Sequence, residues 1–323
     1  MKNHILQINT PTIAESESLG RVPKVSICVV TYNHEKYIGQ CLQSLVEQKT
    51  NFDFEIIVGD DFSTDGTREI VKSFEKKYPS VIFSLFHGEN IGPTRNYVQT
   101  HLLAQGEFVA HLDGDDIAYP GKLQVQYDFL SKNKNYVLVW HRVDIFDDWG
   151  NVNSSLHHRL GEVINVDEIT LKDLAKFGSL GAASSLMYRK SAADFLKKIH
   201  GEALDYFIAI SLLNSGIAAR LDDILGGYRI NLSQVTASKT KSRYFVRSPM
   251  RNLYASHLKS LYFDNKNLKE DIFLNAFFNF LIEIRFLRQS AIPFLLLFLR
   301  TLNISSLLKI PYYFFDAMKI RDR

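Results

Sequence analysis

The chain has 323 residues, of which 46% are hydrophobic and 23% are charged, the composition of a globular protein. This length exceeds that of a typical single domain, so we expect one large domain with an appendage. A formal net charge of only +3 argues against a dedicated nucleic-acid-binding protein, and we expect no nucleic-acid partner.

The cysteines and the N-terminus indicate where the protein works. Cys28 and Cys41 lie in an expected strand and an expected helix and have the character of buried reduced thiols, which are typical of cytosolic proteins. The first twenty residues lack the pattern of a signal peptide, and no apolar run reaches the roughly 20 residues that span a bilayer. We expect a cytoplasmic protein, with the inner face of the cell membrane as an alternative location.

The first half of the chain alternates between strand and helix patterns. Residues 1–23 are polar and irregular and are interpreted as an N-terminal arm, whereas residues 24–31 are almost continuously apolar and predict a buried parallel strand. Further strands are expected at 54–58, 81–86, 108–112 and 136–140. Helices are expected at 35–48, 93–105 and 120–131, and one more is expected to end at residue 74 with Ser63 or Thr64 as its N-cap. This order predicts an α/β fold with a mainly parallel sheet flanked by helices.

Polar residues gather where three of these strands end. In parallel sheets, ligands bind outside the carboxyl ends of the strands. The residues at these ends are Thr31, Tyr32 and Asn33 after the first strand, Asp60 and Asp61 after the second, and Asp113, Gly114, Asp115 and Asp116 after the fourth. Three carboxylates within four residues suit a hard cation such as Mg²⁺ or Mn²⁺, and glycine allows close backbone approach. The alternative is an ordinary polar turn.

Four collinear stretches resemble glycosyltransferase family 2, whose members have the GT-A fold. They read VSICVVTYNHEKYIGQCLQSLVEQ, FEIIVGDDFSTDGT, ENIGPTRN and HLDGDD, and a weaker match continues to about residue 234. The resemblance implies a sugar-nucleotide donor, most often a UDP-sugar. Their order along residues 24–131, rather than any single motif, makes the match specific.

The resemblance assigns donor-binding roles to residues of the first half. Thr31 and Tyr32, with Asn33 in the same turn, match the nucleotide-binding turn, where an aromatic ring can stack on the base. Asp61 matches the acid that accepts a hydrogen bond from uracil, and Asp60 either joins it or orients the turn. Arg95 matches a basic residue beside the diphosphate.

The acidic stretch matches the metal-binding motif of that family. Asp115 is expected to be the principal ligand of Mn²⁺ or Mg²⁺, and Asp113 to contact the ribose or the metal through water. Gly114 allows close approach of the donor, and Asp116 is either an outer partner or an additional ligand.

A helix expected at 201–215 carries the candidate base. Asp205 matches the catalytic carboxylate of the family, usually the second acid of a Glu-Asp pair, but Leu204 stands in the first position here. Glu202 is the alternative base, and the plainer reading of Asp205 is a first-turn acid stabilised by the helix dipole. Tyr228, Arg229 and Asn231 resemble a closing Tyr-Arg-x-His pattern, in which Asn231 replaces the His that in some relatives helps to bind metal or phosphate.

The character of the sequence changes after residue 235. We predict a catalytic domain at 24–235 and a C-terminal helical region at 236–323, rich in aromatic and aliphatic residues and interrupted by Arg and Lys. Interfacial membrane helices have this chemistry, although a helical cap on the catalytic domain or contact with a second copy in a homo-oligomer are alternatives.

The resemblance predicts an inverting, metal-dependent hexosyl- or N-acetylhexosaminyltransferase of surface polysaccharide biosynthesis, acting on a saccharide or lipid-linked saccharide. Two alternatives stay open. A nucleotidyltransferase is disfavoured because the first strand-to-helix turn lacks a glycine-rich basic loop for a triphosphate. A non-catalytic nucleotide-sugar-binding or membrane scaffold protein would explain the departure at Leu204.

Overall fold

The computed structural model describes residues 22–148, 150–156, 168–178, 181–199, 202–203, 205–230, 242–264, 266–285 and 291–302, together with residues 306 and 310. The N-terminal arm expected at 1–23 lies almost entirely outside these ranges, and Asn231 lies outside them too.

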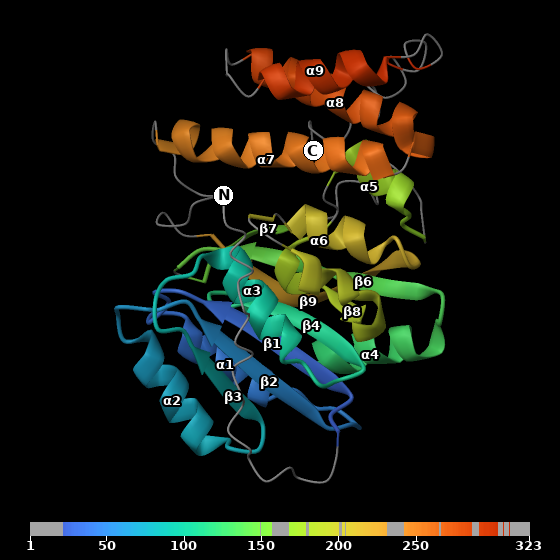
Figure 1. The fold of residues 1–323 in the computed structure, drawn as a ribbon. Helices are drawn as coiled ribbons and strands as arrows, with labels where there is room; N and C mark the ends of the chain where they lie inside the picture. The colour runs from blue at the N-terminus through green and yellow to red at the C-terminus, as the bar shows by residue number, and fades with distance from the viewer. Residues whose placement is uncertain are drawn as a thin grey trace, which may run out of the picture.

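Strands and helices alternate from residue 25 to residue 132, as the sequence predicts, except that the short β5 follows β4 without a helix between them (Figure 1). The strands are β1 (Val25–Thr31), β2 (Phe54–Asp60), β3 (Ile82–Phe86), β4 (Phe108–Asp113) and the short β5 (Ile117–Ala118). The helices are α1 (Ile38–Val46), α2 (Thr67–Lys77), α3 (Pro93–Leu102) and α4 (Lys122–Lys132). The expected cap of α2 is wrong, because Gly66 is the N-cap and neither Ser63 nor Thr64 fills that position.

The sheet is mainly parallel, as predicted, but its second half is mixed. In the described residues the strand order is β3-β2-β1-β4-β8-β6-β9-β5, and β7 (Val152–Leu156) pairs with β6 (Tyr136–Phe146). The first four strands are mutually parallel. The short β8 (Met187–Arg189) pairs antiparallel with both β4 and β6, and β9 (Ile217–Arg229) runs parallel to β6. The fifth strand expected from the sequence therefore exists but is separated from β4 by β8.

Short helices connect the strands of the second half. They are α5 (Leu171–Phe177), α6 (Asp205–Leu212) and the 3₁₀ turns η1 (Ala183–Ser185), η2 (Lys190–Ala192) and η3 (Asp194–Lys198). Thr170 and Asp173 form a reciprocal capping box at the start of α5, which fixes where that helix begins.

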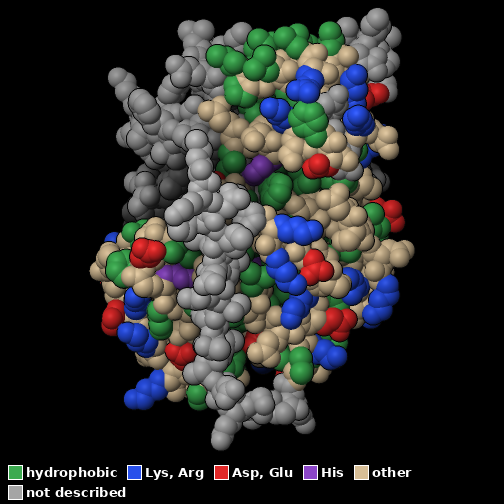
Figure 2. All heavy atoms as spheres, viewed as in Figure 1, with side chains coloured by type: hydrophobic (Ala, Val, Ile, Leu, Met, Phe, Trp, Pro, Cys, Tyr) green, Lys and Arg blue, Asp and Glu red, His purple; other side chains and the backbone are tan. Residues whose placement is uncertain are grey.

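Three longer helices follow the sheet. They are α7 (Ser242–Asp264), α8 (Lys269–Arg285) after the turn η4 (Lys266–Leu268), and α9 (Ala291–Thr301). They form layers beyond α5 and α6, with α9 outermost (Figure 1). Figure 2 shows hydrophobic side chains gathered over this outer end of the molecule, with Lys and Arg beside them. Within the described residues, no helix combines the length and the apolar character needed to cross a bilayer.

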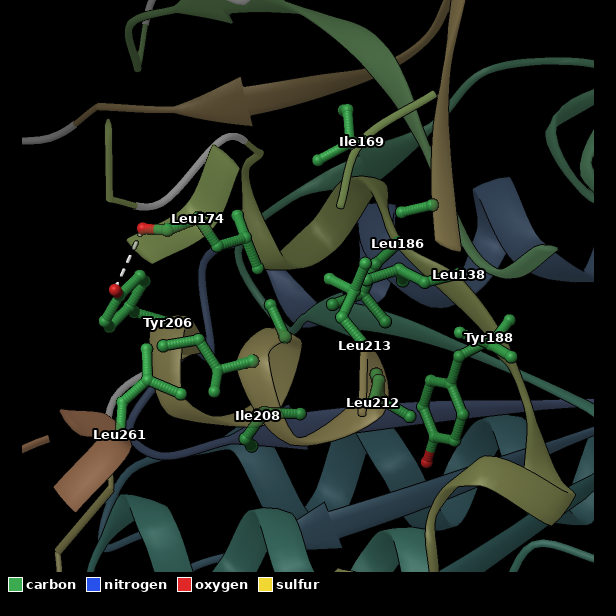
Figure 3. Close-up of a cluster of buried hydrophobic side chains, with 14 of the residues drawn as sticks. Leu138, Ile169, Leu174, Leu186, Tyr188, Tyr206, Ile208, Leu212, Leu213 and Leu261 are labelled. Atoms are coloured by element: carbon green, nitrogen blue, oxygen red, sulfur yellow. Dashed lines mark hydrogen bonds between the residues drawn. The ribbon is translucent and has the colours of Figure 1, made fainter. Parts of the chain in front are cut away.

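One hydrophobic core joins the sheet to the C-terminal helices. Leu138 of β6, Tyr188 of β8, Leu212 of α6 and Leu261 of α7 belong to the same buried cluster (Figure 3). Burying one such side chain fully contributes about 1.5–3 kcal/mol, so the shared core couples these layers strongly. A second cluster packs the other face of the sheet against α1, α2 and α4. The division into units at 24–235 and 236–323 stays a prediction.

Candidate functional site

The ends of β1, β2 and β4 are adjacent at one edge of the sheet. Thr31 is in register with Asp60, and Val30 is in register with Asp113. The backbone N–H of Gly114 donates to the carbonyl of Val30 at 2.9 Å. A Cβ on Gly114 would lie 2.8 Å from Cβ of Thr31, closer than carbon atoms pack, so β1 itself requires glycine here. The three polar strand ends predicted from the sequence therefore meet.

Asp113 is held by a line of buried side chains. Nε2 of His111 donates to its Oδ1 at 3.1 Å, and the hydroxyl of Ser184 in η1 donates to its Oδ2 at 3.3 Å. Behind His111, Nε2 of His101 lies 3.1 Å from Nδ1 of His111, and the Tyr188 hydroxyl lies 2.8 Å from Nδ1 of His101. His101, His111 and Tyr188 are all buried.

The hydrogen bond at the Asp113 end of this line has a fixed direction. Burial, followed by the neighbouring His111, lowers the pKa of His101 well below its usual value, so its ring is neutral and carries one N–H. An ionised Asp113 can only accept, so Nε2 of His111 donates to it. The relay fixes the orientation of the Asp113 carboxylate.

If Asp113 binds a metal, as the motif resemblance predicts, replacing His101 by Phe is expected to lower kcat/KM by about 10-fold, the lower end of the effect of removing a partner that orients a metal ligand. The Phe ring can still stack on Tyr97, whose ring centroid lies 3.7 Å from that of His101, so the fold should persist. Steady-state kinetics and the melting temperature check this. Tyr188→Phe, one bond further from Asp113, should have a smaller effect. A fall in melting temperature with unchanged kinetics would leave the relay a purely structural role.

Asp205 approaches Asp113 from the start of α6. Asp205 is exposed on one side. Desolvation by the surrounding protein, and then the negative charge of Asp113, raise the pKa of its carboxyl above the usual value, and the charge of His111 opposes this shift. Burial also raises the pKa of Asp113, but the hydrogen bond and charge of His111 outweigh it, and the net shift is downward. Acids from two distant segments thus interact, with Asp113 the one that stays ionised more readily.

The next two acids are fixed by Arg229 at the end of β9. Its Nε donates to the carbonyl of Asp115 at 2.8 Å, and its backbone N–H donates to Oδ1 of Asp116 at 2.8 Å. Its guanidinium lies between the rings of Tyr37 and Phe146, at 4.7 and 4.4 Å from their centroids. Arg229, included in the predicted site, is therefore a buried residue that shapes the acidic loop.

Asp115 and Asp116 have different surroundings. Oδ2 of Asp115 lies 3.9 Å from Nε2 of His34, a residue of the turn after β1. Burial, and then the charges of Asp113 and Asp115, raise the pKa of Asp116 well above its usual value. Oδ2 of Asp116 is buried and has no hydrogen-bond partner in the part of the chain that the structure describes.

The turn after β1 is tied to the turn after β2. The backbone N–H of Asn33 donates to the Ser63 hydroxyl at 2.9 Å, and Oδ1 of Asn33 accepts from the backbone of Thr64 at 2.8 Å. Asn33 has a φ of 56°, a conformation that asparagine tolerates better than most residues. These bonds hold Tyr32 on the surface, 44% exposed, beside the buried Thr31. Tyr32 thus has the exposure that a stacking residue needs.

The carboxylates of Asp60 and Asp61 both accept hydrogen bonds from backbone N–H groups. Oδ1 of Asp60 accepts from the backbone of Ser63 at 3.0 Å and from Nε of Arg68 at 2.5 Å, so Asp60 orients the turn, one of its two expected roles. The Asp61 carboxylate accepts from the N–H groups of Ile91 and Gly92 at 2.7 and 3.0 Å. Asp61 therefore fixes the loop that leads into α3.

Glu202 reaches the same helix start from the other side. The hydroxyl of Thr94 lies 3.2 Å from Oε2 of Glu202, and it accepts from the backbone N–H of Ala203 at 3.0 Å. The segment that precedes Asp205 is thus docked on the first turn of α3. Arg95, on that turn, is exposed. The structure brings Asp61, Glu202 and the segment before Asp205 together around α3, and it places Asp113 and Asp205 near enough for their charges to interact.

The carboxylates offer the chemistry of a hard cation site, although they do not enclose one. Asp113 and Asp115 present carboxylate oxygens at one loop, and the buried Oδ2 of Asp116 has no hydrogen-bond partner among the described residues. Among the described residues, no group of three or more His, Cys, Asp or Glu side chains could hold a metal ion by itself. A diphosphate would have to supply the remaining ligands. Asn231, the predicted residue at the far end of the pattern, lies outside the described residues.

Several residues of the site were not assigned roles from the sequence. His34 lies in the turn that follows β1, so its place in the sequence indicated that it could approach the acids. Ser184 and His101 carry no such signal, because each reaches Asp113 or His111 only through packing. The side chains of α7 that support α6 are of the same kind: the ring of Tyr254 lies 4.8 Å from that of Tyr206, and His257 lies 4.6 Å from Phe207.

The fold and the site define an α/β protein whose ligand site lies at the carboxyl edge of a parallel sheet, lined by carboxylates. The family model described as glycosyl transferase family 2 matches residues 26–195. This chain belongs to glycosyl transferase family 2, and the resemblance stated from its motifs is confirmed.

Curated relatives cover differing shares of the chain. An uncharacterised protein of Mycobacterium tuberculosis is 26% identical over 64% of this chain, a match that spans only 58% of the relative's length. An Escherichia coli protein is 27% identical over 76% of this chain and 98% of its own length. That protein is named as a UDP-Glc:α-D-GlcNAc-diphosphoundecaprenol β-1,3-glucosyltransferase.

Solved structures share the fold. The Staphylococcus aureus protein TarS in complex with UDP has a TM-score of 0.62 and 20% identity, over 93% of this chain and 88% of that chain. A mannosyltransferase from Pyrobaculum calidifontis in complex with GDP-Man and Mn²⁺ has a TM-score of 0.56 and 17% identity, over 93% and 85%. At these identities the likeness bears on the fold, and it confirms the predicted GT-A arrangement.

Proposed function

We propose that this chain is an inverting, metal-dependent glycosyltransferase that moves a sugar from a nucleotide sugar, most simply a UDP-sugar, to a lipid-linked saccharide at the inner face of the cell membrane. Family membership supports sugar transfer. The name of the E. coli relative supports a UDP-sugar donor and a lipid-linked acceptor, and surface polysaccharide assembly is the setting that we propose for such an acceptor. The observation that carries the proposal is that the polar ends of β1, β2 and β4 meet at one edge of the sheet, with Asp205 of α6 near enough for its charge to interact with that of Asp113.

In this proposal Asp205 is the general base. It takes the proton of an acceptor hydroxyl while that oxygen forms a bond to the anomeric carbon of the donor. The bond from the anomeric carbon to the diphosphate breaks on the opposite face, the nucleoside diphosphate leaves with the bonding electrons, and the configuration inverts. A raised pKa makes Asp205 a stronger base than an ordinary aspartate, which suits this role.

The donor would lie along the joined turns after β1 and β2. Tyr32 would stack on the base, with Thr31 and Asn33 lining the turn and Asp61 accepting from the edge of the base through a lone pair not used by Ile91 or Gly92. Arg95 would contact the diphosphate from the first turn of α3.

Asp113 and Asp115 are the proposed ligands of Mn²⁺ or Mg²⁺, with Asp116 as an outer partner. The bound cation would stabilise the charge that develops on the leaving diphosphate. Arg229 keeps Asp115 and Asp116 in position through its bonds to both. The His101–His111 relay does the same for Asp113.

A donor screen tests the proposal. The protein is mixed with Mn²⁺ and a panel of UDP-, GDP- and TDP-sugars, and both the melting temperature and the release of nucleoside diphosphate are measured. We expect a UDP-sugar to raise the melting temperature most, and an acceptor extract containing lipid-linked saccharides to stimulate UDP release. Stabilisation by a GDP-sugar alone would overturn the choice of donor.

The same assay separates the two alternatives. A nucleotidyltransferase would release pyrophosphate from a nucleoside triphosphate and a sugar phosphate, which we do not expect from this chain. A non-catalytic binder would be stabilised by UDP with Mn²⁺ but would transfer no sugar to any acceptor of the panel.

A further inference from the structure

The outermost helix, α9, is apolar on both of its faces. Its inner face is buried through Phe294 and Leu297. Its outer face carries Ile292, Leu296 and Leu299, which with Leu302 just beyond the helix are 44–62% exposed. Their spacing of four, three and three residues forms one continuous stripe. A helix that is apolar all round is normally enclosed by protein or by lipid, and this one has a face that no described residue encloses.

A groove runs beside this stripe, between α9 and α7. It has a volume of about 570 Å³, and its apolar lining includes Ala255 of α7 and Pro293, Leu296 and Leu297 of α9. Lys259 of α7 and Arg300 of α9 also line it. Leu296 belongs to both the groove and the stripe, so the two form one surface.

The charge of this surface is positive. Lys259 and Arg300 are exposed, and the sequence of α9 contains no acidic residue. The guanidinium of Arg300 lies 4.5 Å from the ring centroid of Phe263, itself exposed, which holds the cation on the side of α7. Asp264, the acid at the end of α7, accepts from the Ser260 hydroxyl at 3.3 Å and does not line the groove. Apolar area flanked by two cations complements an anionic amphiphile.

We propose that the groove between α7 and α9, with the adjacent stripe, binds the surface of an anionic bilayer. Lys259 and Arg300 take headgroup phosphates, and Leu296, Leu299 and their neighbours enter the boundary of the acyl chains. Helix α9 has 11 residues, too short to cross, so it lies along the surface. A second copy of the chain fits less well, because a symmetric pairing of this surface would bring the same cations together. The inference rests on the proposed function only in that a lipid-linked acceptor gives this surface a purpose.

Vesicle flotation tests the inference with the full chain. The protein is mixed with neutral vesicles of phosphatidylcholine alone, or with anionic vesicles in which roughly one third of the lipid is phosphatidylglycerol. The negative headgroups of the second kind attract Lys and Arg side chains at the membrane surface. We expect flotation with the anionic vesicles and at least about fivefold less with the neutral ones, the effect of about one surface cation. Inositol or glycerol phosphate in solution should not compete at millimolar concentration, because the apolar stripe contributes as well.

Three variants locate the contact. Leu296→Glu with Leu299→Glu should reduce binding to both kinds of vesicle, whereas Lys259→Glu with Arg300→Glu should abolish only the preference for anionic vesicles. Val22→Glu with Val152→Glu, which places the same two charges at exposed apolar residues away from α9, is the matched control and should bind as the unchanged chain does. Stabilisation by UDP is measured for each variant, because it should be unaffected by all three.

The outcomes are distinguishable. Equal flotation of the unchanged chain and the Leu296→Glu, Leu299→Glu variant, or no flotation at all, would overturn the inference. If the chain is instead a dimer in size-exclusion chromatography and these two substitutions make it monomeric, a second copy covers the stripe and the inference is wrong. In either case, stabilisation of the chain by UDP would leave the proposed function intact. If UDP does not stabilise the unchanged chain, that result counts against the proposed function and not against the membrane contact.

Discussion

Replacement of Asp205 by Asn is expected to reduce sugar transfer by about 1,000-fold, within the ~10²–10⁴-fold contribution of a general base. The amide keeps the shape of the side chain but cannot take the proton of the acceptor hydroxyl. Because the donor is held by other residues, stabilisation by UDP with Mn²⁺ should be unchanged. Release of UDP in the presence of acceptor measures the first effect, and a thermal shift measures the second.

The pH dependence of activity is a second way to test the role of Asp205 with the Asp205→Asn variant. Desolvation and the charge of Asp113 raise the pKa of Asp205, so the base becomes protonated at a higher pH than an ordinary aspartate would. Activity of the unchanged chain should therefore be lost as the pH falls through this raised pKa, and the residual activity of the Asn variant should lack that acid limb.

Glu202→Gln is the matched control, because Glu202 is the neighbouring acid and the alternative base. Its carboxylate accepts from Thr94, a bond that the amide oxygen of Gln can also accept, so only a modest effect is expected. If instead Glu202→Gln abolishes transfer and Asp205→Asn does not, the base has been assigned to the wrong acid.

The second large effect is expected for Asp115→Asn. The variant should lose most of the dependence of UDP binding on Mn²⁺, with an apparent affinity for the metal lower by more than about 100-fold, since even partners of metal ligands contribute ~10–100-fold. Arg229 bonds to the backbone carbonyl of Asp115 rather than to its side chain, so the loop should keep its conformation. Calorimetric titration of UDP at several Mn²⁺ concentrations measures this directly.

Asp222→Asn provides the comparison, because Asp222 is an exposed acid of β9 whose side chain pairs only with Arg220 among the ion pairs of the described residues. It should bind UDP and Mn²⁺ as the unchanged chain does. Transfer that survives chelation of divalent cations in the unchanged chain would show that the metal assignment is wrong, whatever Asp115→Asn does.

The first half of the fold was predictable because each element there is encoded locally. The apolar runs of β1, β2 and β4 and the amphipathic spacing of α1 are properties of short windows, and β-α alternation then restricts the topology to a parallel sheet. The insertion of β8 between β4 and β6 was not predictable in this way. Three residues, Met187–Arg189, form that strand, too few to carry a pattern, and their place depends on pairing with strands far away in the sequence.

The sequence by itself determined the class of protein, the acidic stretch at the end of β4 and the polar turns at the ends of β1 and β2. These follow from residue types at short spacing, which local sterics and burial turn into strand ends. Only the tertiary structure decided that the charges of Asp205 and Asp113 interact, that Arg229 holds the acidic loop, and that a relay of His101 and His111 orients its first carboxylate. Those contacts join residues roughly ten to more than a hundred positions apart. Their energy depends on distance and desolvation in the folded chain, and no spacing in the sequence encodes either.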